Sequence, residues 1–422
     1  MRILYFKWNS FGTEDIQEAF NKLGQELVII PYSQDDVDRN SELIEKIIND
    51  IRSYAPDIAF SSNYYPPIAE ACHEAGLIYI SWVYDSPHVM LYSYTAAYET
   101  NRIFVFDREQ YEEFARNKIY TVHYMPLCAN PGRLRALVED EKQQELFRNS
   151  RFYNRSDIAF VGAMYDEEHT FYRRLNSISD HTRGYLEGVI AAQKQLWGYN
   201  FVRELMREDI MDDMSIDIPM QASRDNVASR QYLFAEYCIN REITARERME
   251  YIGEVGRRLS ESGIRGHQSK HFEINKLEES AMDVFGLDLY TGNRELRVEG
   301  VFNHGPIDHY ATAPFVYDRA KINLNITLRS IHSGIPLRAF EIMGSGGFLL
   351  SNYQADFADC YADGEDYVSF GSKEDMLNKI EYYLSHEKER KEIAANGLRR
   401  TMEDHTYEHR VKEMLSESWE SF

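Results

Sequence analysis

Apolar segments of strand length alternate with amphipathic segments of helical length through the first 130 residues of the chain. Residues 2–8 have the composition of a buried strand, and residues 13–24 have the spacing of an amphipathic helix. The same order then recurs, with strands predicted at 26–32, 57–63, 77–84, 102–107 and 121–127, and helices at 41–55, 66–76 and 111–117. Such alternation requires a parallel sheet covered on both faces, so we expect a Rossmann-like α/β domain.

A second region of the same type follows a polar junction at about 132–155. A strand is predicted at 157–165, the pattern then turns helical, including a run at 183–206, and strands are again predicted at 284–292, 297–305, 321–328 and 346–352. Since 422 residues exceed what one core usually serves, we expect two domains. They are residues 1–140 and residues 157–405, the second with a helical insertion at about 167–280.

Composition excludes several classes of protein. The formal net charge of −22 argues against a nucleic-acid-binding surface, because phosphate contacts need clustered Lys and Arg. There is neither an apolar run of about 18 residues nor a signal-peptide pattern at the start. The cysteines are too dispersed for a disulfide framework, which fits a reducing compartment; they are Cys72, Cys128, Cys238 and Cys360. We expect a cytoplasmic protein without a membrane span or a nucleic-acid partner.

No resident cofactor or metal is expected. The first predicted strand is not followed by GxGxxG, so a dinucleotide is not the expected ligand. His267 and His271 have the i, i+4 spacing of zinc ligands, but no Glu follows the first of them and no third ligand is near.

The segment 332–352, HSGIPLRAFEIMGSGGFLLSN, combines a helix with the features of an anion site. Pro336 is suited to the start of a helix, and no acidic residue follows in the first turn. Ser333 and Gly334 come just before, where backbone N–H groups are free at the positive end of the helix dipole and glycine allows close approach. Such a helix start suits a diphosphate.

Arg338 and Glu341 lie three positions apart and therefore share one face of this helix. One interpretation is an intrahelical ion pair, worth about a few tenths of a kcal/mol. In the other, Arg338 binds a phosphate with its planar guanidinium and stabilises the departing diphosphate, while Glu341 accepts hydrogen bonds from a ribose diol. The spacing leaves both open.

Residues at strand ends of the first domain are candidates for contact with a ligand, because ligands bind beyond the carboxyl ends of parallel strands. Asp85 would remove a proton from a hydroxyl of that ligand, or would serve as the turn residue of Asp-Ser-Pro. His88 is an alternative base. Asn9, Ser10 and Gly12 follow the first strand and are candidates for contact with the same ligand.

Candidates for the donor side lie in the second domain. Gly162 follows the strand DIAFV, where a missing side chain lets a donor approach, or forms an ordinary tight turn. Asn325 shares a strand face with Asn323, and both a structural role and a ligand contact fit. His304 is placed to reach the base or a phosphate, or is an ordinary loop histidine.

The order of these motifs resembles the carboxyl-terminal domain of GT-B glycosyltransferases, specifically their CgeB-like (spore-maturation-protein-like) bacterial branch. The resemblance is carried by AKINLNITLRSIHSGIPLRAFEIMGSGGFLLSN, DYVSFGSKEDMLNKIEYYL and EIAANGLRRTMEDHTYEHRVKEML, and upstream by DIAFVGAMYDE, GYLEGVIAAQKQLWG and WVYDSPH. It covers most of the chain and implies a GT-B fold, in which two Rossmann-like domains face each other across a cleft.

The resemblance also implies roles for residues. Glu341 would hold the ribose of a nucleotide sugar, and the segment from Ser333 through Ile335 to Arg338 would cradle its diphosphate. The loop FNHGPID, with His304 and Gly305, would lie near the base. A final helix at 406–422 would cross back to the first domain. Ser333 stands where many retaining members have a glutamate, so the anomeric outcome is not implied.

These features favour a hexosyltransferase-like, metal-independent enzyme that moves a sugar from a nucleoside diphosphate sugar, UDP by preference, to an acceptor. The acceptor would be a glycan, a protein or a small molecule, bound mainly by the first domain. Two alternatives remain open from the sequence. One is an epimerase or hydrolase of the same fold, and the other is a non-catalytic carbohydrate-binding or assembly protein.

Overall fold

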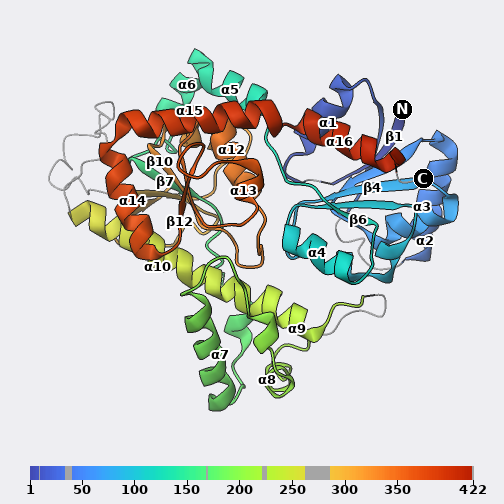
Figure 1. Ribbon diagram of the computed structural model, residues 1–422, viewed down its shortest axis with the longest axis horizontal. Helices are drawn as coiled ribbons and strands as arrows, with labels where there is room; N and C mark the ends of the chain where they lie inside the picture. The colour runs from blue at the N-terminus through green and yellow to red at the C-terminus, as the bar shows by residue number, and fades with distance from the viewer. Residues whose placement is uncertain (9, 34–39, 168–169, 221–225, 262–285, 421–422) are drawn as a thin grey trace.

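The computed structural model describes residues 1–8, 10–33, 40–167, 170–220, 226–261 and 286–420. Two parallel β-sheets of six strands each organise this part of the chain. Figure 1 shows the two sheets in bodies that lie side by side, the first in blue tones and the second built from later residues. The predicted fold class, two Rossmann-like α/β domains, is confirmed.

The first sheet has the order β2–β1–β3–β4–β5–β6 and is parallel throughout. Alternate side chains of its central strands enter different cores, so Ile3 and Tyr5 pack on one face while Leu4 and Phe6 pack on the other. Its strands are β1 (Arg2–Lys7), β2 (Glu26–Pro31), β3 (Ile58–Ser62), β4 (Ile78–Val83), β5 (Asn101–Val105) and β6 (Val122–Tyr124).

Helices cover both faces of this sheet, as the alternation of segments requires. Two short 3₁₀ turns replace a helix between β4 and β5; they are η1 (Val89–Tyr92) and η2 (Tyr94–Ala97). The helices are α1 (Thr13–Lys22), α2 (Ser41–Tyr54), α3 (Pro66–Ala75) and α4 (Arg108–Arg116). Helix α4 begins where Asp107 caps it, its Oδ1 accepting from the N–H of Glu109.

The second sheet has the order β12–β11–β10–β7–β8–β9 and is also parallel. Its strands are β7 (Ile158–Val161), β8 (Leu287–Tyr290), β9 (Val301–Asn303), β10 (Ile322–Asn325), β11 (Leu349–Asn352) and β12 (Val368–Phe370). The accompanying helices are α11 (Ala313–Arg319), α12 (Leu337–Gly344), α13 (Phe357–Cys360), α14 (Lys373–Ser385) and α15 (Glu387–Asp404).

A helical region with its own apolar core lies between β7 and β8 and extends below the sheets in Figure 1. It contains η3 (Tyr172–Arg174), α7 (Asp180–Gln193), η4 (Arg203–Leu205), α8 (Glu208–Met214), α9 (Arg230–Tyr232), the π-helical segment η5 (Leu233–Ile239) and α10 (Asn240–Glu261). The helical run predicted at 183–206 is corrected, because α7 ends at Gln193, whose side chain donates to the carbonyls of Leu196 and Tyr199.

The chain passes between the two bodies near Ala129 and again near Thr406. Helices α5 (Pro131–Glu139) and α6 (Glu141–Arg148) follow the first passage, and α16 (Tyr407–Glu420) follows the second. Helix α16 packs against α1 of the first body, where Lys22 pairs with Glu408 at 2.7 Å (Figure 1). The backbones touch at the passages, since the N–H of Ala129 donates to the carbonyl of His405 at 3.1 Å.

Candidate functional site

A cavity of about 520 Å³ lies between the two sheets, and its walls come from loops at the carboxyl ends of their strands. This interdomain cavity is lined on the first-domain side by Trp8, Tyr84 and Phe106, and on the second-domain side by Gly162, Thr291 and Asn325, among others. Its volume falls in the range of ligand sites, about 300–1,000 Å³. The location is the one expected for ligands of parallel α/β sheets.

The N-terminal end of α12 faces this cavity through Pro336, Leu337 and Arg338. Pro336 is the N-cap, with φ −69°, and no acidic residue lies in the first turn. The first N–H groups of a helix have no acceptor within the helix, and they carry the positive end of its dipole. This end of α12 is therefore suited to an anionic ligand.

Arg338 and Glu341 both line the cavity but make different contacts. A Cβ atom at Gly162 would lie 3.0 Å from Nη1 of Arg338, so the glycine leaves room for the guanidinium. Glu341 is 7% exposed, and its Oε1 lies 2.7 Å from Nε2 of His309. Within the residues that the structure describes, no carboxylate pairs with Arg338. The intrahelical ion pair left open by the spacing is therefore not formed.

His309 connects the two walls of the cavity. Burial disfavours its protonation, but the Glu341 carboxylate outweighs that effect and raises the pKa of His309 above its usual 6.5. The ring of Phe11, from the first domain, packs against it with centroids 4.6 Å apart. His309 is thus the histidine of the FNHGPIDH segment that lines the cavity.

Arg248 of α10 is a candidate that the sequence analysis missed. It lines the cavity, is 3% exposed, and donates from Nε to the carbonyl of Ile326 at 3.0 Å and from Nη1 to that of Ala163. Burial lowers its pKa to about 10, so it remains charged at neutral pH. No carboxylate pairs with it in the described part of the chain. The available signal was an arginine among Tyr251, Ile252 and other apolar helix residues.

The structure corrects the expected position of Ser333, Gly334 and Ile335. The Oγ and N–H of Ser333 donate to Oδ1 of Asp107 at 2.9 and 3.2 Å. A Cβ atom at Gly334 would lie 2.9 Å from the carbonyl oxygen of Phe106, and Ile335, 1% exposed, belongs to the apolar core. This segment packs against the first domain, because the Asp107 carboxylate binds the donors that the sequence assigned to a diphosphate.

His304 and Gly305 also lie away from the interdomain cavity. Nε2 of His304 is 2.7 Å from Oδ1 of Asp288, and both side chains are fully buried. The His304 ring stacks on Tyr290 at 4.4 Å between centroids, and Gly305 has φ +79° beside Arg294. The expected contact of His304 with a base or phosphate is corrected, because the buried acid holds the ring inside the domain.

Asn325 lines the cavity at the end of β10. Its Nδ2 donates to Oγ1 of Thr327 at 3.1 Å and to Oγ of Ser351 at 3.0 Å, while its buried Oδ1 has no partner among the described residues. Its neighbour Asn323 donates instead to the carbonyl of Tyr317 and has a structural contact. Asn325 therefore combines a structural role with a free acceptor at the cavity.

Asp85 and His88, the two candidate bases, differ in exposure. Asp85 is exposed and lines the cavity, and its Oδ2 accepts from Nδ2 of Asn63 at 2.7 Å. His88 is buried, with Nε2 2.8 Å from the carbonyl of Tyr64, and does not line the cavity. Burial lowers the pKa of His88 below 6.5. Of the two, only Asp85 is placed to contact a ligand.

The predicted acceptor residues follow β1. Ser10 lines the cavity, and its Oγ bonds to Oγ1 of Thr13 at 2.9 Å. The N–H of Gly12 donates to the hydroxyl of Tyr310 across the domains at 2.8 Å, and Gly12 has φ +80°. Asn9 lies outside the described residues.

The described residues contain no group of three or more His, Cys, Asp or Glu side chains that could hold a metal ion. His267 and His271 lie outside the described residues. None of the described helices is long and apolar enough to cross a membrane.

The comparisons with known proteins agree with this architecture. Residues 273–416 match a family model described as glycosyl transferase-like, and no curated protein matches the chain. A glycosyltransferase from Rickettsia africae is similar in structure, with TM-score 0.51, 10% identity and coverage of 99% of this chain and 98% of that one.

Two further solved structures are similar at the same level. HepE of Anabaena, in complex with UDP-glucose, has TM-score 0.51 and 9% identity, with both chains covered completely at 100%. A UDP-forming α,α-trehalose-phosphate synthase from Burkholderia vietnamiensis has TM-score 0.51 and 10% identity, with 99% of each chain covered. The chain therefore has the two-sheet α/β fold of GT-B glycosyltransferases and carries a glycosyl transferase-like domain at residues 273–416.

Proposed function

We propose that this protein is a glycosyltransferase that transfers a sugar from a nucleoside diphosphate sugar, with UDP as the favoured nucleotide, to an acceptor. The observation that carries the proposal is the positive charge in the interdomain cavity. Arg338 and Arg248 line it together with the N-terminal end of α12, and no carboxylate of the described residues pairs with either arginine. A diphosphate supplies the missing negative charge.

The donor would lie along α12. Its diphosphate would contact Arg338 and the first N–H groups of the helix, with Arg248 opposite. Glu341, one turn further on, would accept from the ribose hydroxyls, and His309 would share that carboxylate. The finer resemblance to the CgeB-like bacterial branch, and a cytoplasmic location compatible with the free cysteines, belong to the same proposal.

Transfer requires one bond to form and one to break. The acceptor oxygen bonds to the anomeric carbon, the bond between that carbon and the diphosphate oxygen breaks, and the acceptor proton is lost. Asp85, which is exposed and lines the cavity from the first domain, would take the proton. The two guanidinium groups and the helix end would stabilise the charge that develops on the departing diphosphate, without requiring a metal ion.

Thermal-shift titrations with UDP, GDP and TDP, followed by nucleotide-release assays with their sugars, test this proposal. We expect UDP to raise the melting temperature and Glu341→Ala to remove that shift. Glu250→Ala is the matched control, because Glu250 pairs with Lys194 and Lys373 outside the cavity. A wild-type protein that responds to no nucleotide would refute the proposal, and an unchanged shift in Glu341→Ala would refute the ribose contact.

A further inference from the structure

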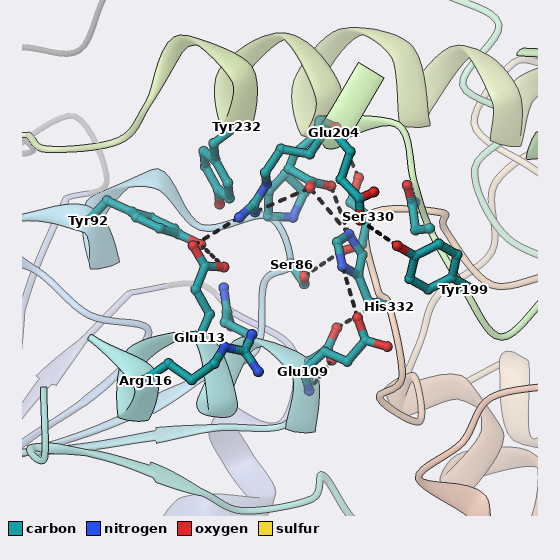
Figure 2. A pocket seen from close by; sticks show the side chains of 16 residues that line it. Ser86, Tyr92, Glu109, Glu113, Arg116, Tyr199, Glu204, Tyr232, Ser330 and His332 are labelled. Carbon is teal, nitrogen blue, oxygen red and sulfur yellow. Dashed lines mark hydrogen bonds and ion pairs between the residues drawn. The ribbon is translucent and has the colours of Figure 1, made fainter. Parts of the chain in front are cut away.

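A second cavity, of about 310 Å³, lies beside the first. Figure 2 shows its labelled side chains pointing toward one another from three parts of the chain. The first domain contributes Glu109 and Glu113 of α4, the loop before α12 contributes Ser330 and His332, and the helical region contributes, among others, Tyr199, Arg203, Tyr232 and Glu236. The helical region therefore completes a site that the two sheets alone would leave open.

The second cavity adjoins the interdomain cavity. Ser86 lines both, and its Oγ donates to the carbonyl of Ser330 at 2.9 Å to form part of the wall between them. Ile331 faces the interdomain cavity while Ser330 and His332, on either side of it, face the second. Asp85, which precedes Ser86, lines the interdomain cavity. A ligand in the second cavity would thus lie next to the proposed base.

The principal charges of the second cavity are already paired. Arg203 lies 2.9 Å from Glu113 and 3.4 Å from Glu236, and His332 lies 3.2 Å from Glu236 and 3.5 Å from Glu109. Burial disfavours a charged His332, but Glu236 raises its pKa well above 6.5, so the pairs are ionic at neutral pH. A strongly charged ligand would have to break these pairs. A neutral ligand with many hydroxyls would not, since hydroxyls both donate to carboxylates and accept from guanidinium groups.

Two buried polar atoms of the residues that line this cavity lack a hydrogen-bond partner among the described residues, Nε of Arg203 and the hydroxyl of Tyr232. Tyr232 is 3% exposed, and its hydroxyl has no hydrogen bond among the described residues. In Figure 2 its ring descends from the helix toward the other labelled side chains. Buried hydroxyls are normally satisfied, so an unsatisfied one at a cavity indicates a ligand that supplies the partner.

Three tyrosines line the second cavity, and one of them is exposed. The rings of Tyr92 and Tyr232 pack against each other with centroids 4.1 Å apart, whereas Tyr199 is 51% exposed at the cavity. Tyrosine combines an apolar face with a polar tip, which matches the mixed surface of a carbohydrate. Tyr232 also immediately precedes the π-helical segment that carries Glu236, and such segments occur frequently at functional sites.

We propose that the second cavity binds the acceptor and that the acceptor is a neutral carbohydrate, held by Tyr232, Tyr199 and the paired carboxylates of α4 and η5. This inference rests on the proposed function, which supplies the donor in the adjoining cavity. The reactive hydroxyl of the acceptor would extend past Ser86 to reach Asp85 in the interdomain cavity.

An immobilised panel of neutral and acidic oligosaccharides, probed with the full chain in the presence of UDP, tests the inference. We expect binding to neutral glycans, weakened roughly tenfold in Tyr232→Phe because one hydrogen bond is lost. The melting temperature of Tyr232→Phe should not fall, since an unsatisfied hydroxyl is removed. Tyr237→Phe is the matched control: its hydroxyl accepts from the N–H of Val89 outside the cavity, so it should lose stability but keep glycan binding.

Tyr199→Ala gives a second test. Because the Tyr199 side chain is exposed, we expect the substitution to have little effect on folding. It should weaken glycan binding several-fold while the UDP thermal shift is kept. Wild-type protein that binds no neutral glycan, or equal binding by wild type, Tyr232→Phe and Tyr199→Ala, would overturn the inference. If the wild type binds neutral glycans but UDP causes no thermal shift, the proposed nucleotide donor is refuted, and the bound glycan can no longer be assigned as the acceptor.

Discussion

The two cavities lie side by side between the same parts of the molecule, yet their arginines differ in whether a carboxylate pairs with them. In the interdomain cavity, Arg338 and Arg248 have no carboxylate partner within the described residues. In the second cavity, Arg203 is held between Glu113 and Glu236, and His332 between Glu236 and Glu109.

This difference indicates what each cavity binds. An unpaired buried cation is costly, so it is retained where a ligand anion completes it. The paired carboxylates and cations of the second cavity instead provide a dense set of hydrogen-bond donors and acceptors, and the excess of carboxylates there disfavours an anionic ligand. The contrast between unpaired and paired charge thus supports the proposed assignment of a nucleotide to the interdomain cavity and of a sugar to the second cavity.

The largest expected effect is a difference in UDP affinity between variants of Arg338 and Arg203. Arg338→Ala should weaken UDP binding by about 10- to 100-fold, because a charge-assisted hydrogen bond of about 1.5–3 kcal/mol is lost. Arg203→Ala should leave UDP affinity within about twofold, although it disrupts ion pairs in the second cavity. Isothermal titration calorimetry measures both. Equal losses of UDP affinity in the two variants would break the comparison between the cavities.

The next effect tests the contact between the two domains beside the cavities. Gly334→Ala places a Cβ atom 2.9 Å from the carbonyl oxygen of Phe106 and 3.0 Å from Cα of Asp107, so the two domains must separate slightly. We expect a loss of about 1–3 kcal/mol in the free energy of unfolding, as for other overpacked sites. Chemical denaturation measures it, with Gly184→Ala as control because no atom lies within 4 Å of that Cβ position. A stability loss no larger than in the control would show that the domain contact is loose.

The smallest effect compares the two histidines. Both pKa values are raised above 6.5 by carboxylates, that of His332 by the larger amount. A raised folded-state pKa contributes stability that is present below pH 6.5 and is lost as the pH rises through the folded pKa. The contribution of His309–Glu341 should therefore disappear at lower pH than that of His332–Glu236.

NMR titration of the histidine ring protons locates the two transitions. Between pH 6 and pH 9, thermal unfolding should show a loss on the order of 1 kcal/mol in the free energy of unfolding. In His332→Gln, the part of this loss at the high end of the pH range should be smaller. Reversal of the order of the two transitions would contradict the stronger pairing assigned to the second cavity.

The sequence was sufficient for the sheets because each strand is specified locally. Ile3 to Phe6 and Ile58 to Phe60 are apolar on both faces, and the helices between them carry their own start and stop signals. Helical spacing also predicted that Arg338 and Glu341 share one face of α12, and both line the cavity. The helix predicted at 183–206 is shorter than expected, because the side chain of Gln193 at the end of α7 donates to the carbonyls of Leu196 and Tyr199 in the non-helical chain that follows.

The rest of the site depends on contacts between distant segments. Ser333 looked free because Asp107, 226 residues earlier, cannot be recognised as its partner from a linear pattern. Arg248 lies in a helix inserted between β7 and β8, and only the folded chain brings it to the same cavity as Arg338. The sequence singled out His304, but Asp288 holds that ring inside the domain, and His309, which pairs with Glu341, is the histidine that lines the cavity.

The paired chain passages near Ala129 and Thr406 have a mechanical consequence. Since these two connections are bonded to each other, and Arg410 donates to the carbonyl of Pro126 beside them at 2.9 Å, they define one axis. A rotation of the two halves about this axis would leave both connections intact, whereas sliding the halves apart would stretch both. Under the proposed function, one such rotation would open the way for the nucleotide and for the sugar, because each cavity is lined by residues from both halves.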